Sequence, residues 1–259
     1  MAFKLDDIII DRIQMAIAED FEGNLLYTLT QLSEASIEVS AESKDAKDKD
    51  GTLIKKFWQG KTGTFTATNA MLNLNVIGEA SGEGKLVASA DAKITMPKLI
   101  TVKAGTTVTL GDYVDGTVKV NALATNGTMG TAYELAETAS ATKFAIADGV
   151  LTPPTDAAET QYVVKYDREV SEGVAISNKA NKFPGTIKLT LKALCVDPCS
   201  ADTLRACYIV LPSFQVSPEV SIELNTEATI EYKGDLQVDY CSADKELYSI
   251  YIASEDEED

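Results

Sequence analysis

Residues 185–195 read GTIKLTLKALC, and this stretch decides the fold class. From Ile187 to Cys195 every second residue is apolar, and only Leu194 interrupts the polar residues between them. Successive side chains of a β-strand point to opposite faces, so this period of two predicts a strand with one buried face.

The same kind of pattern continues on both sides of this stretch. Residues 36–43 read SIEVSAES, in which apolar and polar residues alternate. These patterns predict a mainly β fold, an antiparallel sandwich or barrel with one flanking α-helix. The further segments of strand length in the last third are CYIVLPSF (207–214), PEVSIELN (218–225), ATIEYKG (228–234), LQVDY (236–240) and LYSIYIAS (247–254).

The flanking helix is expected within residues 68–82, TNAMLNLNVIGEASG. Thr68 or Asn69 is expected to cap its N-terminus, and Gly78 or Gly82 to end it. Its inward stripe is expected to comprise Ala70, Leu72, Val76 and Ile77.

The first segment fits either a short helix or an extended arm, because its apolar residues lie close to helical spacing. Aspartates interrupt its short apolar run, so residues 1–20 are not expected to be a signal peptide. No stretch approaches the roughly 20 apolar residues of a membrane span. We therefore expect the protein to be made and used in a reducing cytosol, without membrane insertion.

The composition changes between residues 85 and 170, where Ala, Thr, Gly and Val dominate. Asn-Gly, Asp-Gly and Gly-Asp pairs separate short β-prone pieces there. We predict a small inserted β-rich domain at residues 97–170, the alternative being long loops on a single sandwich. The core would then comprise residues 1–96 and 171–252, followed by an acidic, disordered tail at 253–259.

The charge balance limits the function. The chain of 259 residues has 40 acidic and 23 basic residues, a formal net charge of −17. Such a field repels nucleic acid, so it argues against a direct grip on DNA and suits a surface past which DNA slides.

Catalysis is disfavoured on other grounds. The chain has no histidine, which excludes Ser-His-Asp and Cys-His mechanisms. Residues 78–85, GEASGEGK, lack the spacing of a phosphate-binding loop. We predict that the protein is not an enzyme and uses no cofactor.

Residues 45–65, DAKDKDGTLIKKFWQGKTGTF, allow two readings. Asp48, Asp50 and Gly51 occupy the third, fifth and sixth positions of a calcium loop, but its first position would be Ala46 and its twelfth Phe57. Without those two ligands the oxygen cage is incomplete. The stretch instead predicts the polar turn and one arm of a β-hairpin.

The four cysteines have no zinc-ribbon spacing, and ordinary thiols are expected for them. Disulfides and a four-thiolate metal site remain alternatives. The residues concerned are Cys195, Cys199, Cys207 and Cys241.

The order of these pieces resembles the tail tube proteins of tailed bacteriophages. Residues 50–74, DGTLIKKFWQGKTGTFTATNAMLNL, are similar to the hairpin-to-helix passage of that family. Residues 178–224, which begin NKANKFPGTIKLTLKALC, are similar to the C-terminal sheet of its larger members. The likeness covers residues 1–85 and 165–252, and the middle block departs from the shortest members.

The resemblance implies a structural protein of the virion tail, assembled in the host cytoplasm. Six copies would form a ring whose sheets join into an inner β-barrel, and stacked rings would form a conduit for genome delivery. Its partners would be other copies of itself and tail proteins such as sheath, terminator and baseplate, with DNA passing unbound.

The hairpin and the N-terminal segment of that family commonly reach the neighbouring ring. The arm from Lys44 to Phe57 is therefore expected to make contacts between rings. The candidate inter-subunit residues are Asp48, Asp50, Lys55, Lys56 and Phe57.

Two other classes of function stay open. A capsid decoration or other head protein would share the β-rich, acidic character. A carbohydrate-binding or adhesin module would use Trp58 and scattered tyrosines.

Overall fold

The segment that decides the fold class forms strand β14, Thr186–Asp197, and its residues alternate between half-buried and buried along the whole strand. In the computed structural model, which describes residues 7–198, 200–223, 229–238 and 244–253, β14 lies inside a large antiparallel sheet. Leu194, the apolar residue on the polar side, is only half-buried. The mainly β fold is confirmed.

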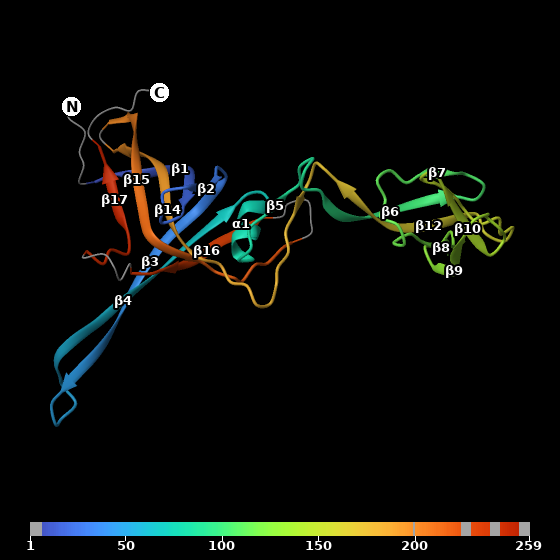
Figure 1. Cartoon of the computed structure of the whole chain (residues 1–259). Coiled ribbons are helices and arrows are strands. Elements are labelled where there is room, and N and C mark those ends of the chain that lie inside the picture. The colour runs from blue at the N-terminus through green and yellow to red at the C-terminus, as the bar shows by residue number, and fades with distance from the viewer. Residues whose placement is uncertain (1–6, 199, 224–228, 239–243, 254–259) are drawn as a thin grey trace. The chain divides into compact units, whose positions relative to one another are not determined.

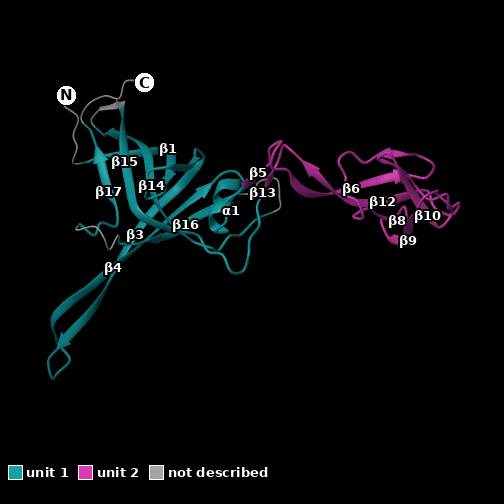
Figure 2. Cartoon of the chain, viewed as in Figure 1, with its two compact units in different colours: residues 1–85, 176–259 teal, residues 86–175 magenta. Residues whose placement is uncertain are grey.

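The chain forms two compact units, residues 1–85 with 176–259 and residues 86–175 (Figure 2). The block 97–170 lies within the second unit. We call the first of the two compact units unit 1 and the second unit 2.

Unit 1 contains the large sheet, with the strand order β2-β1-β14-β15-β16-β4-β3 and with β17 also paired to β15 (Figure 1). Neighbouring strands are antiparallel, and the sheet curls towards a barrel. Besides β14, its strands are β1 Ile9–Glu19, β2 Leu25–Leu29, β3 Leu32–Lys47, β4 Leu53–Asn69, β15 Ser200–Val216, β16 Ile230–Leu236 and β17 Ser249–Ile252.

The core of unit 1 is built on three aromatic rings. Phe65, Phe214 and Tyr232 meet with ring centroids 5.6–6.2 Å apart. A buried hydroxyl needs a hydrogen-bond partner, and the Tyr232 hydroxyl lies 2.8 Å from that of Tyr27. Aliphatic residues from seven strands and the helix complete this cluster.

The flanking helix is confirmed, but its predicted start is wrong. Thr68 and Asn69 end strand β4, because their backbones pair with both β3 and β16. Helix α1 is Leu74–Ala80, and the Asn73 side chain caps it by accepting the N–H groups of Asn75 and Val76.

Two further details of the helix follow from that shift. Ala70 and Leu72 precede the helix and are exposed, so they are not part of its inward stripe, whereas Val76 is buried. Ser81 is the C-cap, and Gly82 follows it with a φ of +73°, the conformation that ends many helices.

Three strand expectations of the sequence also need correction or completion. The first segment is extended and forms β1. Residues 218–223 are not a strand, because Pro218 lacks the N–H that a ladder requires. The expected strands at 228–234 and 236–240 are represented by one strand, β16, which ends at Leu236; Gln237 and Val238 follow it, and residues 239 and 240 lie outside the described residues. The acidic residues 254–259 lie outside the described part of the chain.

Unit 2 has a seven-stranded sheet of its own, with the order β6-β12-β8-β9-β10-β11-β7. Two short strands, β5 Leu86–Val87 and β13 Val174–Ala175, pair the two ends of the unit. The sheet strands are β6 Ile94–Lys103, β7 Val108–Thr109, β8 Lys119–Leu123, β9 Met129–Ala136, β10 Lys143–Ala147, β11 Val150–Thr152 and β12 Gln161–Val170.

The core of unit 2 is a separate cluster. Tyr133 and Tyr162 stack edge to face at 5.5 Å, and the Tyr162 hydroxyl donates to the carbonyl of Pro154 at 3.0 Å. The outermost strand β6 carries Pro97 together with lysines, which discourages pairing with other chains.

Because unit 2 has its own core and paired ends, we expect residues 86–175 to fold alone. The isolated fragment should unfold cooperatively on heating, as followed by circular dichroism. Leu110→Ala removes a fully buried side chain and should destabilise the fragment by about 2–5 kcal/mol. A fragment without a cooperative transition would favour the long-loop alternative.

Strand β16 pairs with β15 up to Gly234, and no side chain fits at this glycine. A Cβ there would overlap the carbonyl oxygen of Gln215 and lie 2.7 Å from the Phe214 ring. Gly234→Ala should therefore lower the free energy of unfolding by about 1–3 kcal/mol, measured by urea denaturation. Gly60→Ala is the control, because a Cβ at Gly60 meets nothing within 4 Å; equal losses in both variants would contradict this account.

Candidate assembly interface

Strands β3 and β4 continue beyond the body of unit 1 as a two-stranded ribbon (Figure 1). Strand β16 pairs with β4 only from Gly63 to Asn69. Beyond Gly63, strands β3 and β4 pair only with each other among the described strands. We call residues 41–62 the arm.

The end of the arm is a turn held by one carboxylate. Asp48 accepts the backbone N–H groups of Asp50 at 2.9 Å and Thr52 at 2.8 Å through one side-chain oxygen. Gly51 has a φ of +84°, which favours glycine. The polar turn is confirmed, and the Asp48 carboxylate serves the turn.

The arm exposes apolar side chains on both faces. The pairing with β3 places Phe57 on one face of the arm and Trp58 on the other. A register shift leaves Ile54 as the extra residue of a β-bulge, and Leu53, paired with Lys47, lies on the Trp58 face. The exposed fractions of Leu53 and Phe57 are 50% and 51%, and those of Ile54 and Trp58 are 69% and 67%. All residues from Leu53 to Thr62 are exposed.

A lysine accompanies the aromatic ring on each face. The Lys55 ammonium lies 5.0 Å from the Phe57 ring centroid, and that of Lys56 lies 5.4 Å from the Trp58 centroid. Lys56 also lies 4.0 Å from the Asp45 carboxylate. These contacts order the side chains but leave them in water.

Such an arm is an unfavourable structure on its own. An isolated two-stranded hairpin is marginally stable in water, and burying an aliphatic or Phe side chain stabilises by about 1.5–3 kcal/mol. Burial of its apolar side chains against a partner surface would therefore stabilise the arm.

The predicted contact residues have different positions. Asp50 is exposed at the tip, Lys55 and Phe57 share one face, and Lys56 lies on the other. Whether they contact another subunit stays a prediction. Ile54 and Trp58 were not among the predicted contact residues, although the run LIKKFW contains four apolar side chains.

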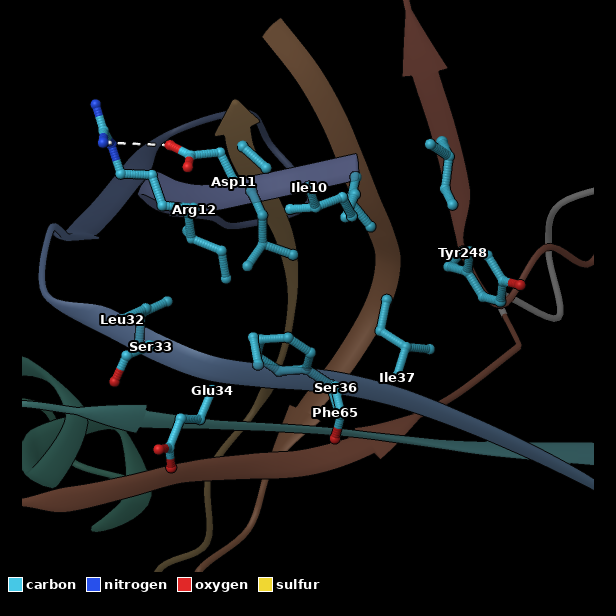
Figure 3. Close-up of a pocket in the computed structure, with 16 residues that line it drawn as sticks. Ile10, Asp11, Arg12, Leu32, Ser33, Glu34, Ser36, Ile37, Phe65 and Tyr248 are labelled. Atoms are coloured by element: carbon cyan, nitrogen blue, oxygen red, sulfur yellow. Dashed lines mark ion pairs between the residues drawn. The ribbon is translucent and has the colours of Figure 1, made fainter. Parts of the chain in front are cut away.

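A second surface of unit 1 is an apolar groove of about 640 Å³ (Figure 3). Strand β1 forms one wall and β3 the other, and β14 and β15 contribute Leu191, Ala193 and Ile209. Tyr248 and Ile250 lie at its β17 side.

The cysteines give no further site in the described residues. Cys195 and Cys207 are buried free thiols on β14 and β15, and burial raises the pKa of both. Cys199 and Cys241 lie outside the described residues. Within the described ranges no group of three or more Cys, Asp or Glu side chains is placed to hold a metal.

An exposed two-faced arm and an open apolar groove on one chain mark a β-rich structural protein with surfaces for association. The comparison with family models agrees. Residues 7–246 match the YomU/Tube protein family, so the chain belongs to this family of phage tail tube proteins. A search of curated proteins finds no match.

The family is a structural one and places the protein in the virion tail. Among the described residues, no helix is long and apolar enough to cross a membrane.

Removing the turn carboxylate tests how the arm is held. Asp48→Ala leaves two backbone N–H groups without their acceptor, so we expect the hairpin end to lose about 1 kcal/mol. Amide exchange in the arm should become faster, while the free energy of global unfolding stays unchanged because the arm lies outside the core. Asp50→Ala is the matched control; equally fast exchange in both variants would contradict the role of Asp48.

Proposed function

We propose that this chain assembles into hexameric rings that stack into the tail tube, the conduit for genome delivery. The observation that carries the proposal is the arm: an exposed, apolar, two-stranded extension on a chain of the tail tube family.

The ends of the unit 1 sheet support ring formation. Strands β2 and β3 are the two edge strands of this sheet in the described part of the chain. Strand β2 exposes Leu25 and Leu26. Open strand edges attract further strands. Joining the sheets of six copies would cover these edges in a closed barrel.

The charge supports the proposed passage of DNA. With a net charge of −17, the copies lining a channel repel phosphate instead of binding it. DNA then passes through the lumen without a specific site. No catalytic step belongs to this function.

The proposed partners are the chain itself and, in the complete tail, the sheath, terminator and baseplate proteins. Assembly takes place in the host cytoplasm. The arm joins one ring to the next through both its lysines and its apolar side chains.

Electron microscopy of the purified protein tests this function, with rings of six-fold symmetry and tubes as the expected result. Lys55→Glu with Lys56→Glu should shorten or abolish tubes while the monomer stays folded, because both side chains are exposed on the arm. The matched control is Lys103→Glu with Lys143→Glu, which reverses two exposed lysines of unit 2.

If the arm variant forms normal tubes, the two lysines of the arm do not contribute to the contact between rings. A protein that stays monomeric at every concentration would contradict the proposed function itself.

A further inference from the structure

The groove of unit 1 exposes apolar side chains that the described part of the chain leaves uncovered. Ile10 on one wall and Ile250 on the β17 side are each about half exposed. Leu32, Phe65 and Leu191 are buried and lie deeper in its lining. An exposed apolar hollow of this kind marks a site of association.

The groove is open because the curled sheet does not close. Among the described strands, β1 pairs with β2 and β14 and β3 pairs with β4, so no ladder between them joins the β1 and β3 walls. Strand β3 shifts register between Ser33 and Ser36. Glu34, at this bulge, has a φ of +48°, a costly conformation for a side chain with a Cβ. The bulge therefore bends β3 at the groove.

The arm has the side chains to fill such a groove. Ile54 and Trp58 are its most exposed apolar side chains. The groove volume of about 640 Å³ lies in the usual range of pockets that enclose a whole ligand.

The arm cannot reach the groove of its own chain. Ile37 lines the groove, whereas Trp58 pairs with Ser43, six residues further along β3. At the rise of a strand this is about 20 Å, and the ribbon extends away from the body of unit 1 (Figure 1). The occupant must then come from another copy.

Charge favours the same occupant. Six of the 23 basic residues lie in the 22 residues of the arm, against four acidic ones, so the arm carries +2 and the remainder of the chain −19. The groove lining includes the carboxylates of Asp11 and Glu34, with Asp11 paired to Arg12 at 3.2 Å. Lys56, beside Trp58, brings a positive charge to Glu34. A basic arm and an acidic body attract each other.

We infer that the groove between β1 and β3 is the seat for the arm of a second copy, with Ile54 and Trp58 inserted into it. Since the donor and acceptor surfaces differ, each copy offers an arm to one neighbour and a groove to another. Such a head-to-tail contact produces an open filament. The inference rests on the proposed tube and names the surface that receives the arm.

Trp58 is the only tryptophan of the chain, so its fluorescence reports on the seat directly. We compare dilute protein with assembled protein and follow assembly by light scattering and electron microscopy. On assembly, the emission should shift to shorter wavelength and acrylamide quenching should fall several-fold.

Variants of the groove and the arm locate the seat. Ile250→Lys places a like charge opposite the basic arm and should abolish the shift. Tyr251→Lys changes the neighbouring exposed residue on the other face of β17 and should leave the shift intact. Ile54→Ser should reduce the shift, whereas Phe57→Ser, on the face of the arm opposite to Trp58, should reduce it less. Circular dichroism confirms that each variant is folded.

The outcomes separate this inference from the proposed function. If tubes form in which Trp58 stays as exposed as in the monomer, the inferred contact between arm and groove is wrong, whereas the proposed tube is not contradicted. The same holds for an Ile250→Lys variant that retains the full shift. Wild-type protein that never associates would contradict the tube and the seat with it.

Discussion

The antiparallel pairing of β3 with β4 is the constraint on which unit 1 depends. At one end of this pair, Phe65 and Ala67 of β4 are buried in the core and β16 extends the sheet. At the other end the same two strands continue into water as the arm. Because the same two strands pair at both ends, with register shifts between Ala41 and Ser43 and between Ala46 and Lys47, the folding energy of the core fixes the direction of the arm.

This continuity explains how an apolar arm stays ordered without a partner in the chain. A free hairpin of this length would be marginal, but here its register is set by body pairs such as Phe65 with Ile37. The arm therefore loses its conformational entropy when the chain folds and not when it associates, which is the advantage of a preorganised binding element.

The elements of the fold that have a clear local sequence pattern were largely predictable. The alternation from Ile187 to Cys195 gave β14, and the polar run before Gly51 gave the turn of the arm. The helix start was misplaced because Asn69 and Asn73 are equally good caps locally, and only pairing of Asn69 with Leu32 and Ile230 excludes the first. The groove was not predictable, since its lining comes from strands far apart in the sequence and depends on how far the sheet curls.

The exposed arm and groove also raise the question of how the monomer avoids uncontrolled association. A net charge of −17 makes the monomers repel one another, and this opposes a single arm contact. Between two stacked rings of the proposed tube, six arms engage six grooves at once. The second and later contacts are intramolecular, so their effective concentration is high and the summed affinity far exceeds that of one arm. Weak single contacts then keep isolated chains soluble, while a completed ring forms a stable platform for the next. Ordered growth of the tube therefore requires that the contact between one arm and one groove be weak as well as specific.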